Sequence, residues 1–507
     1  MSEDYFIKYI DCTLGICKWG ALQLSLYFLM PYLWNYEYAF STIVLISLYT
    51  SLYVIYWNLL DKEKRVRWIL LPYLLYLATA ITLFFFRENW ITSVWFCVLL
   101  PLYGFICFLC IKLYRKYLKR IRKRIKYGRA ISYTVVIVFF ITLKSLSVLW
   151  MCQEHQSLDS EKNDILERRN YLVEKLITTP QEVLNEMPSS IGSQFQGEWA
   201  LYSCSMLSAS LVNISKLYPE TKTENIKCID KLINIVKSPE LRHYDTMRWG
   251  EDPLESLDED NSHISYLSHL AWMICGYREI SGNHKYDELL TDLCETMNRR
   301  ILSSKSMNLP TYPGESIYVP DMLVAIVALN QYAVTHKGKY RSTVKKWVAK
   351  AQKDWLDKET GLLASFIDEN GFLYDDAPIK GSYSALNCYY LTLIDEAFAK
   401  TQYQQLKALF WKDGIISGLK EYWDRTCYVG LDIDAGPIVF ELGPSGTAFF
   451  AGSSTYFGDY NVRKEILATA EMAGHTIKIG NKRHYLLANV ALVGESIMLA
   501  MRTHIKH

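Results

Sequence analysis

The chain has 507 residues, of which 50% are apolar, 21% charged and 14% aromatic, with 37 tyrosines and 14 tryptophans. This composition excludes a disordered or low-complexity protein, which would be poor in aromatic residues and rich in charge. The formal net charge of +2 excludes little, because it averages two unlike regions. Residues 1–152 carry 18 basic and 7 acidic side chains, whereas acidic side chains outnumber basic ones in the remainder.

Five apolar stretches within residues 1–152 have the composition of membrane spans, which need roughly 20 residues each. Basic loops at 61–67 and 112–129 alternate with short, nearly neutral loops, and positive loops stay on the cytoplasmic side of a membrane. We therefore expect a multi-pass integral membrane protein of the inner or plasma membrane, with the lipid bilayer as a partner and an extracytoplasmic C-terminal domain. The predicted spans are residues 19–34, 38–60, 68–86, 89–111 and 130–152.

The loop at 112–129 is strongly basic, and either nucleic acid or lipid headgroups would suit its charge. Anionic lipid headgroups are the simpler partner for a basic cluster next to a membrane span. We therefore expect no nucleic-acid partner.

The cysteines indicate buried thiols rather than a disulfide framework. Seven of the 12 cysteines lie at or after residue 152, with wide spacing and without a CxxC or Cys/His zinc pattern. Several of them fall inside apolar helical patterns, where cysteine behaves as a small hydrophobic residue. Buried thiols in a bacterial envelope protein are consistent with both this pattern and the predicted spans.

Residues 153–185 have the charged pattern of a helical connector, and residues 186–507 contain helical periodicity that recurs in pairs. About a dozen paired helices predict an (α/α)6 toroid, whose inner helices line a central funnel, so the expected fold class is all-α. A solenoid such as TPR is the alternative, but no sequence repeat of about 34 residues is visible. Short extended segments are expected at 362–372 and 430–440. The expected helices are 197–217, 222–237, 263–281, 284–303, 317–336, 340–355, 382–399, 402–419, 447–457, 460–475 and 486–502.

Carboxylates, tryptophans and tyrosines gather in the segments that lead into every other predicted helix. In a toroid these segments converge on one end of the funnel. Aromatic walls with several carboxylates are typical of a site for a hydroxylated or sugar-like ligand, with acid/base chemistry available. The catalytic candidates are His269, Asp321, Glu198, Asp252 and Asp434, and the substrate-binding candidates are Trp249, His263, Tyr266, Tyr312, Glu315, Tyr318, Asp375, Tyr383, Asn387 and Glu441.

Motifs for other chemistries are missing from the sequence. There is no P-loop, GxGxxG, HExxH or serine-elbow motif. His263 and His269 are six residues apart and so do not share a helix face on which to bind one metal ion. His269, among apolar neighbours, fits a buried core histidine as well as a catalytic one. The sequence predicts a reaction without a cofactor or a metal ion.

Two segments resemble the linalool dehydratase/isomerase family. They are 260–270 (DNSHISYLSHL), continued by 272–286, and 312–321 (YPGESIYVPD). The resemblance implies an (α/α)6 barrel in which His269 matches a functional histidine and Tyr318 an aromatic residue of the site. Tyr312 and Asp321 stand where the family has its two functional cysteines. The implied reaction is a dehydration and isomerisation of a terpene alcohol by acid/base chemistry without a cofactor.

We therefore expect a membrane-anchored enzyme that performs lyase or isomerase chemistry on a hydroxylated substrate such as an isoprenoid alcohol. The alternative is a glycan-active enzyme, since Asp321 with Glu198, Asp252 or Asp434 opposite would suit the carboxylate pair of a glycoside hydrolase. Its substrate would be a glycan or glycolipid. A third possibility is a glycan-binding module that has lost catalysis.

Overall fold

The computed structural model describes residues 158–187 and 193–506, apart from 375–378, 415, 433–434, 486–487 and 489–491. The chain divides into two units, Met1–Ser147 and Val148–His507, and the described residues belong to the second. The predicted domain boundaries at 152 and 185 stay predictions. The five predicted spans lie outside the described residues.

The prediction of a membrane protein is corrected by the described helices. Among them, none is both long enough and apolar enough to cross a bilayer. The most apolar stretch, α14 (Val319–Thr335), has only 17 residues, and the longest helix, α9 (Ser193–Leu217), carries serines along its length. The structure supports a mostly helical toroid as the fold class. A transmembrane bundle, a bilayer partner and an extracytoplasmic location have no support in it.

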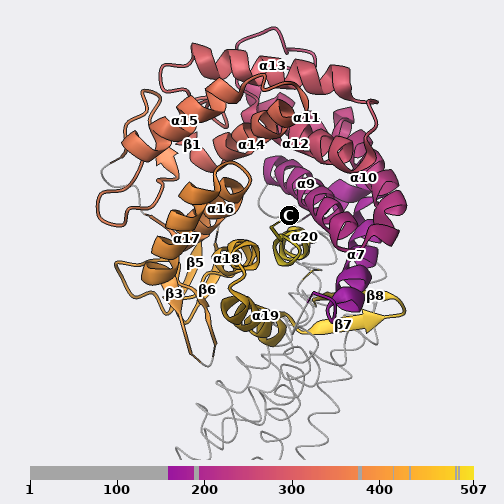
Figure 1. The fold of residues 1–507 in the computed structure, drawn as a ribbon, viewed down its shortest axis with the longest axis vertical. Helices are drawn as coiled ribbons and strands as arrows, with labels where there is room; N and C mark the ends of the chain where they lie inside the picture. Colours follow the sequence, from indigo (N-terminus) through magenta and orange to yellow (C-terminus); the bar gives the residue numbers. More distant parts are fainter. Residues whose placement is uncertain are drawn as a thin grey trace, which may run out of the picture. The chain divides into compact units, whose positions relative to one another are not determined.

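In the part of the chain that the structure describes, six inner helices form a closed ring (Figure 1). Each packs against the next along the chain, and the last packs against α9, which closes the ring. Almost every residue of α12 and α14 is buried, as expected for helices that are apolar all round. The inner helices are α9, α12 (Ile264–Ser281), α14, α16 (Gly381–Thr392), α18 (Pro444–Tyr456) and α20 (Leu492–Arg502).

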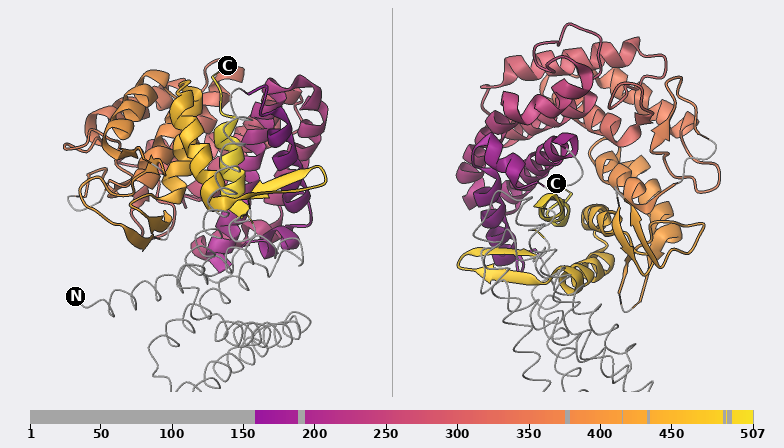
Figure 2. Two further views of the ribbon diagram at one scale, coloured as in Figure 1. Left: turned by 90° about the horizontal axis from the view of Figure 1, so that it is seen from below. Right: turned by 180° about the vertical axis from the view of Figure 1, so that it is seen from behind.

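Outer helices surround this ring, as Figures 1 and 2 show. They are amphipathic, with one buried stripe and one exposed face. The sequence predicts helices in pairs, and the alternation of inner and outer helices confirms this pairing. The outer helices are α7 (Lys162–Leu176), α10 (Lys222–Val236), α13 (Asp287–Ser303), α15 (Arg341–Asp354), α17 (Glu396–Phe410) and α19 (Tyr460–Gly474).

Among the described residues, three short helices join these pairs: α8 (Pro180–Asn185), the 3-10 helix Pro219–Thr221 and α11 (Pro239–Trp249). Helix α11 is not predictable from its sequence, because only three of its 11 residues are buried and no apolar stripe forms. Helix α7 falls within the predicted connector. It packs against α20 and α9 and so completes the outer layer where the ring closes.

Four two-stranded antiparallel sheets lie among the described residues, between helices. The predicted extended segment at 362–372 contains β2, and the one at 430–440 contains all but the first residue of the β5–β6 hairpin. The strands β1, β7 and β8 were not predicted, and β3 and β4 lie at the end of the segment 402–419, for which the prediction of a single helix was wrong. Tyr318 pairs with Phe366 directly before α14 begins, which fixes the approach of the chain to that helix. The strands are β1 (Ile317–Tyr318), β2 (Phe366–Ile367), β3 (Trp411–Lys412), β4 (Gly418–Leu419), β5 (Val429–Asp432), β6 (Gly436–Val439), β7 (Thr476–Ile479) and β8 (Lys482–Tyr485).

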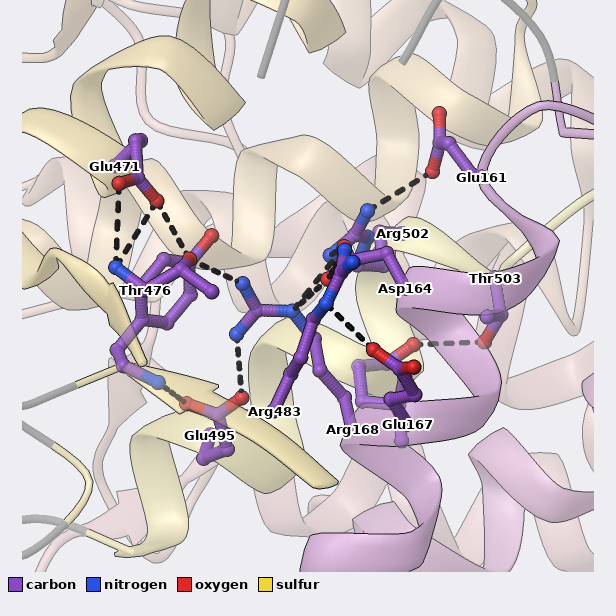
Figure 3. A network of polar contacts seen from close by, with 12 residues as sticks. Glu161, Asp164, Glu167, Arg168, Glu471, Thr476, Arg483, Glu495, Arg502 and Thr503 are labelled. Carbon is purple, nitrogen blue, oxygen red and sulfur yellow. Dashed lines mark hydrogen bonds and ion pairs between the residues drawn. The ribbon is translucent and has the colours of Figure 1, made fainter. Parts of the chain in front are cut away.

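A buried network of charges fastens α7 to α20 at the closure of the ring (Figure 3). The Arg502 guanidinium pairs with Asp164 at 2.7 Å and with Glu161 at 3.1 Å. Arg168 pairs with Asp164 at 3.1 Å and with Glu495 on α20 at 2.8 Å. All of these side chains are buried, so each depends on its partners to offset the cost of leaving water.

Five cysteines of the described region are buried free thiols, as the sequence predicts, and Cys427 is half-buried. Burial raises the pKa of Cys204 and Cys388 to about 12, which keeps both thiols protonated and unreactive. The buried ones are Cys204, Cys228, Cys275, Cys294 and Cys388.

Candidate active site

Polar side chains from the N-terminal halves of α9, α12 and α14 gather in one part of the ring, which we call the mouth. Five side chains there form the mouth cluster: Glu198 and Tyr202 of α9, His269 of α12, Tyr312 from the loop before β1, and Asp321 of α14. The charges of Asp321 and Glu198 both act on the Tyr202 and Tyr312 phenols. The mouth therefore brings together three of the five predicted catalytic residues.

Asp321 is a buried carboxyl group in the first turn of α14, with a side chain only 2% exposed. Burial raises its pKa to about 6, although the Thr311 hydroxyl, which donates to Oδ2 at 2.7 Å, favours the ionised form. A carboxyl group that holds its proton near neutral pH can act as a general acid. No described cation pairs with Asp321.

Glu198 is held as a hydrogen-bond acceptor at the start of α9. The Tyr312 phenol donates to its Oε2 at 3.0 Å. The guanidinium of Arg248, at the end of α11, lies 4.2 Å from the centre of the Tyr312 ring and pairs with Glu315 at 3.3 Å. The two carboxyl groups therefore lie in unlike surroundings. Asp321 is buried among neutral groups, and Glu198 is partly exposed beside a phenol and close to a cation.

Gly197 allows this arrangement because α11 passes directly over it. A Cβ atom at Gly197 would lie 2.6 Å from Cβ of Tyr244, a distance that real atoms do not adopt. The glycine next to Glu198 thus permits the close approach of α11, which carries both Tyr244 and Arg248.

We expect Gly197→Ala to lower the free energy of unfolding by about 1–3 kcal/mol, because the added methyl group forces α9 and α11 apart. Gly494→Ala is the matched control, since a Cβ at Gly494 in α20 meets nothing within 4 Å. That control should be neutral or slightly stabilising, by up to about 1 kcal/mol. Chemical denaturation of both variants is the measurement, and equal effects would contradict the packing argument.

His269 is fully buried on α12, and its two ring nitrogens have different surroundings. Nδ1 lies 2.8 Å from the Ser205 hydroxyl, whereas Nε2 has no hydrogen-bond partner among the described residues. The ring lies 4.4 Å from that of Tyr202. Burial lowers the pKa of His269 to about 3, so the imidazole is neutral at physiological pH. It can exchange a hydrogen bond with a ligand but is a weak base.

Aromatic rings line the mouth on the side of α14 and α16. The Tyr318 ring lies 5.2 Å from Phe366 and 5.5 Å from Tyr383, and these two rings are 5.3 Å apart. Tyr383 is in the first turn of α16, and the Lys380 ammonium group lies over its ring. Tyr318 and Tyr383 therefore lie in one aromatic group with Phe366, and their role in binding a substrate stays a prediction.

His263 and Trp249 belong to a neighbouring buried site rather than to the mouth cluster. His263 Nδ1 lies 2.5 Å from Asp245, and Nε2 lies 3.3 Å from Glu251. The ring of Trp249 packs 5.3 Å from that of His263. The Ser256 hydroxyl lies 3.4 Å from Nε2 but donates to the carbonyl of Asp252, so it is not poised as a nucleophile. This group holds the loop between α11 and α12.

Asp252 stabilises that same loop through hydrogen bonds within the protein. Its Oδ2 pairs with Arg242 at 2.7 Å, and its Oδ1 accepts the backbone N–H of Leu254 at 2.9 Å. Both oxygens are therefore occupied within the protein.

Tyr266 and Asn387 are buried structural side chains. The Tyr266 phenol donates to the carbonyl of Val236 at 3.0 Å, and the Asn387 amide donates to Leu363 at 3.2 Å. Glu441 pairs with Lys412 at 2.5 Å in the loop after β6. None of these contacts reaches the mouth cluster. Asp375 and Asp434, the remaining candidates, lie outside the described residues.

Sequence reasoning missed Tyr202, Thr311 and Glu421. Tyr202 stands four residues after Glu198 and so shares its helix face, a signal that the sequence does carry. Glu421 is fully buried and accepts the Ser382 hydroxyl at 2.7 Å, and burial raises its pKa to about 7. It is an isolated acidic residue in an irregular segment, and no local pattern distinguishes it. Within the described region, no group of three or more His, Cys, Asp or Glu could hold a metal ion.

No protein-family model matches the chain, and no curated protein matches it. Among solved structures, it is similar to an unsaturated glucuronyl hydrolase specific for heparin, with 11% identity over 70% of this chain and 96% of that one and a TM-score of 0.44. It is also similar to the alpha-1,6-mannanase GH76A of Salegentibacter sp. HEL1_6, with 13% identity. That match covers 67% of this chain and 98% of the mannanase, with a TM-score of 0.40. An inactive variant of that mannanase, in complex with alpha-1,6-mannotetrose, is 14% identical, and the match covers 66% of this chain and 98% of that one with a TM-score of 0.40.

Proposed function

We propose that the protein is a glycan-active enzyme that cleaves a glycosidic bond at the mouth of the toroid by acid/base catalysis. The observation that carries the proposal is the pair of carboxyl groups in contrasting surroundings, Asp321 and Glu198, both close enough to Tyr312 and Tyr202 to act on them electrostatically. Two carboxyl groups with different environments are what glycoside hydrolysis uses.

The surroundings assign a role to each carboxyl group. Asp321, with its raised pKa, would donate a proton to the oxygen of the leaving group. Glu198, held by the Tyr312 phenol, would act as the carboxylate partner, either activating water or attacking the sugar carbon. His269 would accept or donate a hydrogen bond through its unpaired Nε2.

The aromatic wall supports a sugar as the substrate. Phenol groups present both a flat apolar face and a hydroxyl group, which suit the two kinds of surface on a sugar ring. Tyr312, Tyr318 and Tyr383 supply such groups at the mouth.

The resemblance to the linalool dehydratase/isomerase family stays a prediction, and a terpene-alcohol reaction would use the same Asp321. A terpene is mostly hydrocarbon, whereas this wall is rich in phenols, which favours the glycan. The products separate the two reactions, since hydrolysis yields a reducing sugar and dehydration yields an alkene. A glycan-binding module without catalysis would bind oligosaccharides and release neither product.

The proposal is tested by assaying the full chain against a panel of oligosaccharides and aryl glycosides, with release of reducing sugar as the readout. For any substrate that is cleaved, we expect Glu198→Gln to lower kcat by about 100-fold or more, with the fold retained because Gln can still accept from Tyr312. Glu315→Gln, on the exposed side of Arg248, is the control and should keep activity. Loss of activity in the control alone would refute the role of Glu198.

A further inference from the structure

Arg248 is a cation that lies beside the mouth cluster without belonging to it. It stands near the end of α11, and its guanidinium lies 4.2 Å from the centre of the Tyr312 ring. The phenol of the same tyrosine donates to Oε2 of Glu198 at 3.0 Å. A cation, a ring and a carboxylate thus follow one another in contact, and we call these three side chains the Arg248 series.

The ion pair with Glu315 does not account for the position of Arg248. The two charged groups are 3.3 Å apart, and their side chains are 30% and 49% exposed, a kind of pair that contributes little to stability. Nε of Arg248 is buried and has no hydrogen-bond partner among the described residues. Because a buried donor without an acceptor costs free energy, the contact with the Tyr312 ring is the main interaction that this placement secures.

Helix α11 is anchored on both sides of Arg248, which fixes the guanidinium over the ring. Tyr244, one turn earlier, packs directly on α9. Asp245 lies 2.5 Å from His263 at the start of α12, and both side chains are fully buried. The ring of Trp249, the residue after Arg248, packs 5.3 Å from the same histidine. The end of α11 is therefore held against both α9 and α12.

The other groups that act most strongly on Tyr312 and on the neighbouring phenols are carboxyl groups and further phenols. The phenols are neutral, because burial raises their pKa. Arg248 is thus the cation in direct contact with this neighbourhood. A cation on the face of a phenol favours negative charge on its oxygen and so strengthens it as a donor, and a donor to a carboxylate favours the ionised form. The surrounding groups are Tyr202, Tyr244, Asp245 and Asp321, with Glu315 on the outer side of Arg248.

We propose that Arg248 is a positioning residue of the mouth, which acts through Tyr312 to keep Glu198 ionised and in place. The inference rests on the proposed function, in which Glu198 is the carboxylate partner of the hydrolysis. Arg248 acts on the reaction only through the other two members of the series.

Titration of the Glu198 carboxyl group in the full chain tests this assignment without a substrate. Carbon-13 NMR of glutamate-labelled protein follows the group, whose signal is identified by its loss in Glu198→Gln. We expect Arg248→Met to move the midpoint to higher pH by at least about 0.5 pH unit, and Arg248→Lys, which keeps the charge, to move it less. Arg242→Met is the matched control, since Arg242 is also on α11 but pairs with Asp252, and it should leave the midpoint unchanged.

Tyr312→Phe distinguishes action through the phenol from direct attraction between Arg248 and Glu198. This variant keeps the ring beneath the guanidinium but removes the donor. In the Tyr312→Phe background, Arg248→Met should add little to the shift of the Glu198 midpoint, because the two changes remove one interaction. Equal shifts in both backgrounds would overturn the action through Tyr312, and an unchanged midpoint in Arg248→Met would overturn the assignment as a whole.

The same variants separate this inference from the proposed hydrolysis. On any glycoside that is cleaved, Arg248→Met should move the acidic limb of the kcat/KM profile to higher pH, as the NMR midpoint moves. A loss of turnover in Glu198→Gln, with profile and midpoint unchanged in Arg248→Met, would refute the role of Arg248 and leave the hydrolysis standing. A shifted midpoint in a chain that cleaves no glycoside would support the Arg248 series and refute the hydrolysis.

Discussion

Asp321→Asn is expected to lower kcat by about 1,000-fold on any glycoside that the wild-type protein cleaves, because a positioned general acid contributes roughly 10²- to 10⁴-fold. The amide has nearly the shape of the carboxyl group and can still accept the Thr311 hydroxyl, so the fold should be kept. Substrate binding should also persist, since the variant loses a proton donor and not the aromatic wall. Steady-state kinetics with isothermal binding measurements separate these two effects.

The pH dependence of the same variant provides an independent check. The pKa of Asp321 is raised by burial from 3.8 to about 6. The folded state therefore prefers the protonated form, and the stability this contributes is present below about pH 4 and lost as pH rises through 6. The wild type should lose about 3 kcal/mol over that interval relative to Asp321→Asn. The activity of the wild type should fall above about pH 6 as the acid loses its proton.

Asp252→Asn is the matched control, because the sequence also predicts Asp252 to be catalytic. Because Arg242 and the Leu254 amide occupy its two oxygens, this substitution should reduce stability and change kcat less than threefold. A large loss of turnover in Asp252→Asn, with activity retained in Asp321→Asn, would reverse the assignment of the site.

Arg502→Met is expected to have the largest effect on stability, about 3–5 kcal/mol, because it leaves the buried carboxylates Glu161 and Asp164 short of positive charge. Arg502 is fully buried at the end of α20, where the ring closes on α7. Arg463 stays paired with Glu161 and Arg168 with Asp164, so each carboxylate loses one of its buried cationic partners and keeps another. Denaturant titration of the full chain is the measurement.

Lys506→Met is the control for that substitution, because the Lys506–Glu396 pair is exposed on both sides. Exposed pairs contribute roughly 0–1 kcal/mol, so this variant should be nearly neutral. Similar stability of Arg502→Met and Lys506→Met would show that the network does not hold the ring closed.

The helices of the toroid could be predicted from the sequence because their signal is local. Inner helices such as 263–281 and outer ones such as 284–303 differ in the width of their apolar stripe, and Gly or Pro residues mark their ends. The same local reasoning placed Glu198, His269, Tyr312 and Asp321 at helix starts. Helix α11 lacks an apolar stripe and was therefore missed.

The roles of the individual carboxylates could not be predicted, because each depends on partners that are distant in sequence or that no local pattern marks. Asp252 and Asp321 look alike in the sequence, yet one is paired with Arg242 and the other is buried with a neutral hydroxyl group. Glu421 has a raised pKa because folding buries it, although the Ser382 hydroxyl of α16, 39 residues earlier in the chain, donates to it and favours the ionised form.

The sequence by itself thus determined the paired helices and the clustering of polar residues at their starts, since both follow from the spacing of neighbouring residues. Closure of the ring was decided by the tertiary structure, through contacts such as Arg502 with Glu161 across 341 residues. The tertiary structure also decided which carboxyl group keeps its proton, because burial and the nearest charge set a pKa. Neither quantity exists until the chain has folded.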